Sequence, residues 1–320
     1  MPQENTVFMF SGQGSHYFQM GRELFEGNPL FRRHFLRMDE VAADLLGVSL
    51  SKMLYGDRRK SDAFDCTLLS SSSIFVVEYA LAQTLLGNGV EPDMMLGASL
   101  GVYCSIALAD CLNAEETLAL VIGQAKVFDQ RCERGSMLAL LADPRLYAES
   151  PVLYCNSEIA ASNYAGHFVI SARQTDLPQI ESFLKARDVV FYNLPVSRPF
   201  HTRWTEPARS AILALLESLQ FARPKLPVVC CAQAGPLDDI TPAVLWTSLR
   251  ERIDFEWAIR RLELEGPHRY IDVGPMGTLA TFLKYLLPSS ARSRVHAVMT
   301  PFGTDHKNLA ELLTGSQMSV

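Results

Sequence analysis

A serine inside a Gly-x-Ser-x-Gly pentapeptide is the clearest candidate nucleophile of the chain. Residues 97–101 read Gly-Ala-Ser-Leu-Gly, follow the apolar run 94–96 and precede a helix-forming stretch that begins at Val102. This order predicts a strand, a tight turn and a helix, with Ser99 at the strained apex of the turn. Backbone N–H groups at a helix N-terminus can hold a developing oxyanion, and the N–H of Leu100 is the expected donor. We therefore predict covalent catalysis through Ser99.

A serine nucleophile needs a base that removes its proton. The chain has seven histidines, and spacing alone does not choose among them. Local context favours His201, because the extended segment 196–200 passes through a proline and leads into a helix start at this histidine. A loop at the edge of a sheet is a suitable place for a base. We predict that His201 is the partner of Ser99.

A second glycine-rich turn lies near the N-terminus. Gly12-Gln13-Gly14 follows the short apolar segment 7–10, and its position suggests the N–H of Gln13 as the second oxyanion donor. The turn is not a dinucleotide-binding fingerprint, because Tyr17 stands where the third glycine of that motif belongs. The sequence therefore predicts no cofactor.

The expected elements form two parts. Strands and helices alternate over residues 1–131, which argues for a parallel sheet covered on both faces. Short strands with one helix at 177–186 follow within 132–196, a pattern typical of a ferredoxin-like unit. Strand-like segments at 228–231 and 269–273 then rejoin the first sheet. We predict an α/β fold, with a hydrolase-like large domain formed by 1–131 and 197–320 and a small ferredoxin-like insert at 132–196.

Composition narrows the class of protein. The chain has 320 residues, 48% of them hydrophobic, and a net charge of −6, which suits a large core and not a nucleic-acid surface. The densest basic cluster, 58–60, is short and flanked by acidic residues. Neither the seven cysteines nor the histidines have metal-ligand spacing, so we expect reduced thiols, no metal and a cytoplasmic protein. We predict neither a signal peptide nor a membrane-spanning segment.

Several segments together resemble the family of malonyl-CoA:acyl-carrier-protein transacylases and polyketide synthase acyltransferase domains. Residues 8–15 and 20–24, which read Phe-Met-Phe-Ser-Gly-Gln-Gly-Ser and Met-Gly-Arg-Glu-Leu, are similar to the opening of those proteins. The pentapeptide around Ser99 resembles their Gly-His-Ser-Leu-Gly turn, and Phe200-His201 resembles their catalytic histidine segment. Residues 273–279 resemble their late Val-Gly-Pro-Gly loop. The similarity extends from about residue 7 to residue 302.

The resemblance implies a ping-pong reaction through an acyl ester of Ser99, with His201 as general base and then general acid. In that family a backbone carbonyl seven residues before a tryptophan orients the histidine. Aligning this tryptophan with Trp257 assigns the carbonyl to Arg250. The implied partner is an acyl-carrier protein with a phosphopantetheine-linked acyl chain, and acyl-CoA is a further candidate donor. A basic rim is expected to meet the acidic carrier protein, and three residues are candidates by position: Arg198, Arg203 and Lys284.

The departures from the family concern the acyl site. Malonyl-using members carry an arginine that binds the free carboxylate of the substrate, and the register places Gln124 at that position. A neutral amide does not replace the guanidinium charge, and burying an unpaired carboxylate costs on the order of several kcal/mol. Ala98 replaces the histidine before the nucleophile, and Ser71 replaces a pocket-lining glutamine. With Phe200, these residues predict an acyl pocket for a neutral and larger chain.

The same glutamine is typical of stand-alone acyl hydrolases from polyketide pathways that lack built-in acyltransferases, and residues 299–302 also resemble that subgroup. We therefore expect an acyl hydrolase that releases neutral acyl groups from acyl-carrier protein, a proofreading role. The alternative is a transacylase that moves a non-malonyl acyl unit between CoA and carrier protein. A non-catalytic docking protein is disfavoured because Ser99 and His201 are both present. An ordinary esterase with Asp272 and His296 as acid and base is disfavoured by the glycine-rich opening and the insert.

Overall fold

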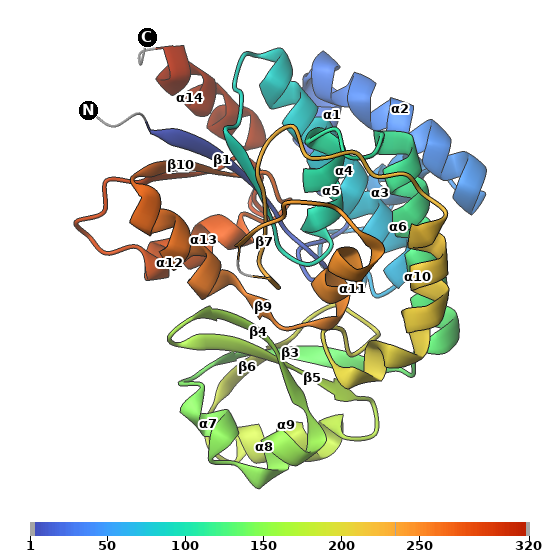
Figure 1. Ribbon diagram of the computed structural model, residues 1–320, viewed down its shortest axis with the longest axis vertical. Coiled ribbons are helices and arrows are strands. Elements are labelled where there is room, and N and C mark those ends of the chain that lie inside the picture. Colours follow the sequence, from blue (N-terminus) through green and yellow to red (C-terminus); the bar gives the residue numbers. More distant parts are fainter. Residues whose placement is uncertain (1–3, 234, 318–320) are drawn as a thin grey trace.

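The computed structural model describes residues 4–233 and 235–317 and has two parts separated by a cleft (Figure 1). The larger part is built on a six-stranded sheet of order β11-β10-β1-β2-β7-β8. Every neighbouring pair is parallel except β7 and β8. The strands are β1 (Asn5–Phe10), β2 (Met94–Gly97), β7 (Val228–Cys230), β8 (Gly235–Pro236), β10 (His268–Asp272) and β11 (Arg294–Ala297).

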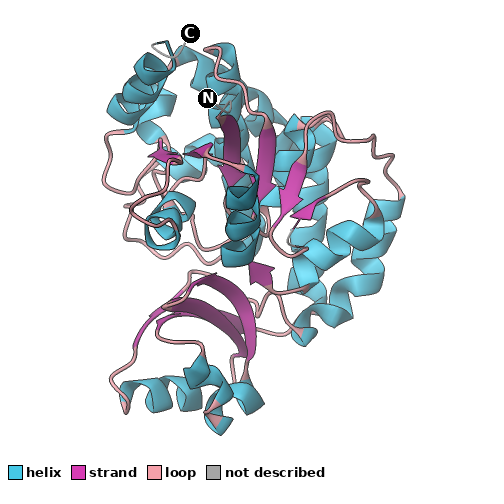
Figure 2. Cartoon of the chain, turned by 60° about the vertical axis from the view of Figure 1, so that its left-hand side comes forward, coloured by secondary structure: helices cyan, strands magenta, loops and turns pink. Residues whose placement is uncertain are grey.

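Helices cover this sheet on both faces (Figure 2), which explains why its central strands are continuous apolar runs. Residues 7–10 of β1 and all of β2 are buried. The helices of this part are α1 (Arg22–Gly27), α2 (Pro29–Leu46), α3 (Leu50–Tyr55), α4 (Thr67–Gly87), α5 (Gly101–Leu108), α6 (Ala114–Arg131), η1 (Arg203–Ala208), α10 (Arg209–Glu217), α11 (Pro242–Arg250), α12 (Phe255–Glu265), α13 (Thr278–Leu286) and α14 (Asp305–Gln317). The architecture confirms the predicted α/β fold.

Helix α4 is the central helix of the larger part. It is long and apolar enough to cross a bilayer, and it is the one helix of the described chain with this property. Its apolar window is 83% buried inside the protein, because α4 packs against α2, α5 and α6. An all-round apolar helix of this kind is the core of a large domain.

The smaller part folds as β-α-β-β-α-β around a sheet of order β6-β3-β5-β4, the ferredoxin-like arrangement that the sequence predicts. Its strands pair antiparallel. The helices lie on one face, over a separate core that includes Leu138, Phe168 and Ile180. The elements are β3 (Gly135–Leu141), α7 (Arg145–Ala148), α8 (Pro151–Asn156), β4 (Glu158–Tyr164), β5 (His167–Arg173), α9 (Leu177–Lys185) and β6 (Val190–Asn193).

A fifth strand, β9 (Ile253–Asp254), extends the small sheet by pairing parallel with β4. It comes from the segment that follows α11 in the larger part, so the small sheet is not built from residues 132–196 alone. The two parts are therefore joined by a shared sheet as well as by the chain connections between α6 and β3 and between β6 and η1. The connection between β6 and η1 and the shared strand β9 both contribute residues to the lining of the cleft, where the candidate site is found.

Candidate active site

Ser99 occupies the sharp turn between β2 and α5, as predicted. Its φ of 56° lies in the left-handed region, a strained conformation for a residue other than glycine. Small neighbours make the turn possible, because a Cβ at Gly101 would lie 2.1 Å from the carbonyl oxygen of Phe10. The strained turn therefore lifts the Ser99 hydroxyl out of the sheet and toward the cleft.

His201 lies on the connection between β6 and η1, and both nitrogens of its ring form hydrogen bonds. Ser99 Oγ is 2.7 Å from Nε2, and the carbonyl oxygen of Glu251 is 2.8 Å from Nδ1. A carbonyl only accepts, so Nδ1 carries the proton and Nε2 accepts the hydroxyl hydrogen of Ser99. The geometry is that of a nucleophile and its general base.

The orienting carbonyl is that of Glu251, and the prediction of Arg250 is wrong by one residue. Helix α11 ends at Arg250, and Glu251 adopts an extended conformation with φ −80° and ψ 159°. This change of direction turns the Glu251 carbonyl out of the helix and toward His201. The Arg250 side chain instead pairs with Glu206 at 2.8 Å.

Burial lowers the pKa of His201 to about 4, the carbonyl of Glu251 opposes this shift, and the nearby Arg250 charge adds to it. The imidazole is 3% exposed. It is therefore neutral at physiological pH and ready to accept the Ser99 proton without first losing one.

The two predicted oxyanion donors lie on neighbouring turns. Gly12 packs so tightly on the Ser99 turn that a Cβ there would be 2.8 Å from Ser99 Cβ and 3.3 Å from the Leu100 nitrogen. Neither the Gln13 N–H nor the Leu100 N–H donates to another described residue. Both amides therefore remain available to an oxyanion on an acylated Ser99.

Hydrogen bonds hold the Gln13 turn in place. The Gln13 side chain donates from Nε2 to Ser71 Oγ at 2.5 Å, and Ser70 Oγ donates to Gln13 Oε1 at 3.1 Å. Both serines belong to α4, so the serine run of that helix supports the turn that carries the second oxyanion donor.

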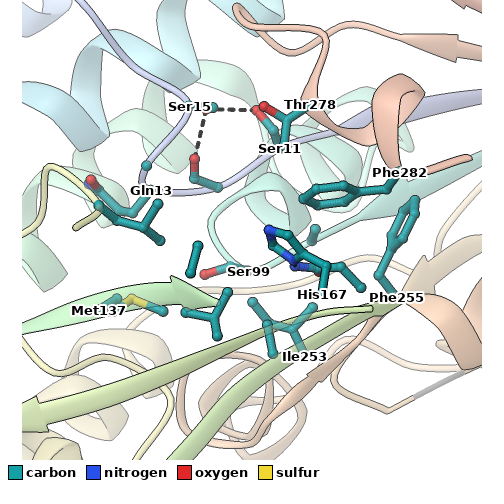
Figure 3. Close-up of a pocket in the computed structure, with 18 of the residues that line it drawn as sticks. Ser11, Gln13, Ser15, Ser99, Met137, His167, Ile253, Phe255, Thr278 and Phe282 are labelled. Carbon is teal, nitrogen blue, oxygen red and sulfur yellow. Dashed lines mark hydrogen bonds between the residues drawn. The ribbon is translucent and has the colours of Figure 1, made fainter. Parts of the chain in front are cut away.

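Glu78, a buried carboxyl that sequence reasoning missed, lies behind the same turn. Its Oε1 accepts from the Ser11 N–H at 2.8 Å and from Ser11 Oγ at 2.7 Å. Ser15 Oγ contacts Ser11 Oγ and also donates to the Gly12 carbonyl at 2.7 Å (Figure 3). Burial raises the pKa of Glu78 well above its usual range, and the hydrogen bonds from Ser11 oppose this. The sequence did contain a signal for this buried carboxyl, because Glu78 is the one acidic residue in the otherwise apolar run 74–82.

The site opens into an outer cleft of about 340 Å³ between the two parts of the protein. Side chains from both parts point into it, among them Met137 and His167 from the small sheet and Phe255 and Phe282 from the larger part (Figure 3). Ala98, Ser99, Phe200 and His201 also line it. Most of the lining is aliphatic or aromatic, which suits an apolar ligand.

A second space, the inner chamber, adjoins the cleft at Ser99 and His201 and has a volume of about 20 Å³. Of the four residues predicted for the acyl pocket, Gln124, Ser71 and Phe200 line this chamber, whereas Ala98 lines the outer cleft alone. No lysine, arginine, aspartate or glutamate of the described residues lines either space. The site thus has no fixed charge that would neutralise a carboxylate.

The remaining predicted residues are the acid of an alternative esterase triad and the basic rim for a carrier protein, and their contacts bear on these roles. Asp272 accepts from the backbone N–H groups of Gly274 and Ala280, and no hydrogen bond among the described residues joins it to His296, so the two do not form the acid–base pair of an esterase triad. Arg198 is buried and pairs with Asp129, so it is not part of a basic rim, and Arg203 pairs with Glu158. Residues 4–233 and 235–317 hold no cluster of three or more potential metal ligands.

This combination of fold, tight turn and histidine is that of an acyl-transferring enzyme. The chain belongs to the acyl transferase domain family, whose model matches residues 7–318. It is 39% identical over 307 residues to the polyketide biosynthesis acyltransferase homolog PksD of Bacillus subtilis, covering 96% of this chain and 95% of that protein. It is also 39% identical to the polyketide biosynthesis protein ThaF of Burkholderia thailandensis, over 95% of this chain but only 26% of that protein.

Solved structures of related domains confirm the fold. The acyltransferase domain of the second module of the salinomycin polyketide synthase matches with a TM-score of 0.84 at 25% identity, covering 97% of this chain and 72% of that chain. The loading acyltransferase of the avermectin polyketide synthase matches with a TM-score of 0.86 at 21% identity, covering 98% and 99%.

Proposed function

We propose that the protein is an acyl hydrolase that releases neutral acyl groups from acyl-carrier protein in polyketide biosynthesis. Names of full-length relatives such as PksD connect this family to polyketide pathways, and a proofreading enzyme of such a pathway would act in the cytoplasm. The observation that carries the proposal is the absence of a cationic residue from the described lining of the cleft and the inner chamber, together with the hydrogen bond between Ser99 and His201.

The chemistry follows from the site geometry. His201 Nε2 takes the Ser99 proton while Oγ attacks the thioester carbon, and the N–H groups of Gln13 and Leu100 hold the oxyanion. The thiol of the carrier protein leaves with the proton from His201, so that Ser99 holds the acyl group as an ester. Water then attacks this ester, with His201 as its base, and collapse releases the free acid and regenerates Ser99.

The acyl group must be neutral because the site is poor in charge. A malonyl or methylmalonyl carboxylate held near Ser99 would meet the apolar side chains of the cleft or the Gln124 amide, and no cation in either space. An unpaired buried charge costs on the order of 3–5 kcal/mol, which corresponds to a factor of more than one hundred in binding. Acetyl and longer unsubstituted chains avoid this penalty and gain from the apolar cleft.

The decisive experiment loads a carrier protein with acetyl or octanoyl groups and adds the enzyme. We expect catalytic release of free acid, measured by mass spectrometry of the carrier, and no transfer to a second, unloaded carrier protein. The Ser99→Ala variant should lose turnover because it has no nucleophile, and Ser105→Ala, at a buried serine of α5 outside both spaces, is the matched control. Efficient transfer with little free acid would overturn hydrolysis in favour of the transacylase alternative, which the acyltransferase names of the relatives support.

Adding a cation to the inner chamber tests the selectivity directly. Introducing Gln124→Arg places a cation in the inner chamber, so the amount of malonyl ester formed on Ser99 from malonyl-CoA should rise at least tenfold. Intact-protein mass spectrometry measures this ester, and the wild-type chain provides the baseline. An unchanged malonyl adduct in a folded variant contradicts the role assigned to Gln124.

A further inference from the structure

We infer that the inner chamber binds the water molecule that hydrolyses the acyl ester, and that the Gln124 amide positions this water. The inference rests on the proposed hydrolase function and assigns to Gln124 a positive task, beyond the absence of a cation. It also assigns different ligands to the two spaces, with water in the inner chamber and the acyl chain in the outer cleft.

The first observation is an unsatisfied amide. Gln124 lies on α6 and is 3% exposed, and its Oε1 is buried with no hydrogen-bond partner among the described residues. A buried amide oxygen without a partner costs about 1–3 kcal/mol. A ligand that donates a hydrogen bond inside the chamber removes this cost.

The second observation is the size and polarity of the chamber. Its volume of about 20 Å³ is sufficient for a water molecule. A buried water needs two to four polar partners. The chamber provides six polar side chains, those of Gln13, Thr67, Ser71, Ser99, Gln124 and His201.

The third observation is the relation between the two spaces. Ser99 and His201 line both, so the chamber and the cleft meet at the reacting groups. Only the cleft, with about 340 Å³ and an apolar lining, has room for an extended acyl chain. With the chain in the cleft, a water in the chamber lies beside the ester and within the same lining as the base.

The step is balanced without any further reactant. The water oxygen attacks the ester carbon while His201 Nε2 takes one water proton, and the oxyanion forms toward Gln13 and Leu100. Collapse of the tetrahedral intermediate breaks the bond between the carbon and Ser99 Oγ, and His201 returns the proton to Oγ. The products are the carboxylic acid and free Ser99. Gln124 Oε1 accepts the second hydrogen of the water throughout, so it is a positioning residue that fixes the direction of the attacking lone pair.

The test compares Gln124→Met with the wild type. Methionine has a similar size and no hydrogen-bonding amide, and its introduction removes an orphaned polar group, so the variant should fold and melt at or above the wild-type temperature. Gln130→Met, an exposed site on the same helix, is the matched control. Each protein receives octanoyl-carrier protein, and we follow formation of the octanoyl-Ser99 ester, its hydrolysis, and its transfer to N-acetylcysteamine as a soluble thiol.

We expect Gln124→Met to form the octanoyl-Ser99 ester at the wild-type rate. Hydrolysis of this ester should be at least tenfold slower than in the wild type, and the rate of its transfer to N-acetylcysteamine should be unchanged. The ester then accumulates, which a merely structural defect would not produce. Gln124→Asn, with a shorter amide, should fall between the two. Hydrolysis that stays at the wild-type rate in Gln124→Met, or that falls together with ester formation and thiol transfer, overturns the inference. The proposed function itself fails if the wild type releases little or no acid and transfers the acyl group instead.

Discussion

At the scale of single residues, the site uses a backbone carbonyl where many serine enzymes use a carboxylate. The Glu251 carbonyl fixes the tautomer and the orientation of His201 with a dipole and no formal charge. A neutral orienting group stabilises the imidazolium less than a carboxylate does. Burial therefore lowers the pKa of His201 to about 4, and the Glu251 carbonyl opposes this shift only in part.

The lowered pKa predicts a wide range of active pH. Because His201 acts in its neutral form, kcat/KM should be flat from neutral pH down to about pH 5 and should fall tenfold per unit below a pKa of about 4. A steady-state pH profile with an acyl-thioester substrate measures this. An acid limb near 6.5, the ordinary pKa of histidine, would contradict the burial argument.

The pH profile of kcat/KM needs a control for unfolding at low pH. In the unfolded chain a histidine takes up a proton below about pH 6.5, whereas burial lowers the pKa of both His201 and His16 to about 4 in the folded protein. The unfolded state therefore binds more protons between these values, and the free energy of unfolding declines as pH falls from 6.5 to 4. Circular dichroism at each pH separates loss of activity from loss of structure.

At the scale of elements, helix α4 and the turn after β1 are locked together through the Glu78 carboxyl. Burial keeps this carboxyl protonated above its ordinary pKa of 4.5. As pH rises above 4.5, the unfolded state loses the Glu78 proton while the folded state keeps it. Glu78 therefore makes the protein less stable as pH rises. Its oxygen is nevertheless needed, because Ser11 would otherwise have a buried N–H without an acceptor.

Glu78→Gln should keep the acceptor and remove the titration. We expect the difference in unfolding free energy, variant minus wild type, to grow in favour of the variant as pH rises above 4.5, with activity nearly retained. Chemical denaturation at several pH values measures the trend. Glu78→Ala, which deletes the acceptor, is the contrasting variant and should lose about 1–3 kcal/mol or more. A pH-independent difference for Glu78→Gln would show that the carboxyl is ionised in the folded protein.

The close contact between the two turns gives a second prediction at this scale. In Gly12→Ala the added Cβ would lie 2.8 Å from Ser99 Cβ and 3.0 Å from the Ala98 carbonyl oxygen, both on a rigid turn. The oxyanion donors must then separate, and we expect kcat to fall by a factor of about 10²–10³, as when one donor is lost. Gly166→Ala is the matched control, because its nearest neighbour is 3.8 Å away and its φ is not positive. Equal activity of the two variants would contradict the assigned geometry.

The small sheet supplies an apolar floor to the cleft. Ala139 pairs with Tyr192 and Leu141 with Val190, and these residues line the cleft face. Leu141, Val190 and Tyr192 are 53%, 62% and 66% exposed. Exposed apolar side chains at the edge of a ligand site are candidates for contact with a long acyl chain.

Replacing Val190 in this floor should therefore affect long chains alone. We expect Val190→Ser to lower kcat/KM for octanoyl-carrier protein about fivefold, equivalent to about 1 kcal/mol of lost apolar burial, and to leave acetyl-carrier protein unchanged. Val152→Ser, at a partly buried site on α8 away from the cleft, is the control. An equal loss for both substrates would place the acyl chain elsewhere.

The elements that carry the nucleophile and the ferredoxin-like insert were predictable because their signals are local. A strand, a small-residue turn and a helix are encoded within residues 94–108, and strand periodicity is encoded within each short strand. The Glu251 carbonyl and the β9 pairing were not predictable in this way. Both depend on where α11 ends in space relative to the small sheet, a long-range contact that no local pattern specifies.

At the scale of the whole molecule, the site depends on the relative position of the larger and the smaller part. The site residues come from the turn after β1, from the β2–α5 turn and from the connection between β6 and η1. Glu251 comes from the segment between α11 and β9. The sequence predicted two parts and the residues that meet between them. It did not predict the contacts that fix their relative position, because these contacts involve residues distant in sequence.

Arg198 is the clearest of these contacts and allows a final prediction. It leaves the small part three residues before His201, yet its guanidinium donates to the carbonyls of Phe128 and Asp129 at the end of α6 and pairs with the Asp129 carboxylate at 3.2 Å. The connection between β6 and η1 is thereby tied to the last turn of α6. The Arg198 side chain is only 10% exposed, so its bonds are shielded from water, and removing one partner of such a pair is costly.

Arg198→Met should therefore lower the free energy of unfolding by about 2–4 kcal/mol and reduce kcat, because His201 loses the support of its connection. Arg203→Met is the matched control. Its pair with Glu158 is 2.8 Å long, but its side chain is 56% exposed, so the loss should stay within about 1 kcal/mol. Urea denaturation and steady-state kinetics of both variants measure the two effects. Equal stability of the two variants would mean that burial of Arg198 contributes nothing, and that the relative position of the two parts is set by the β4–β9 pairing instead.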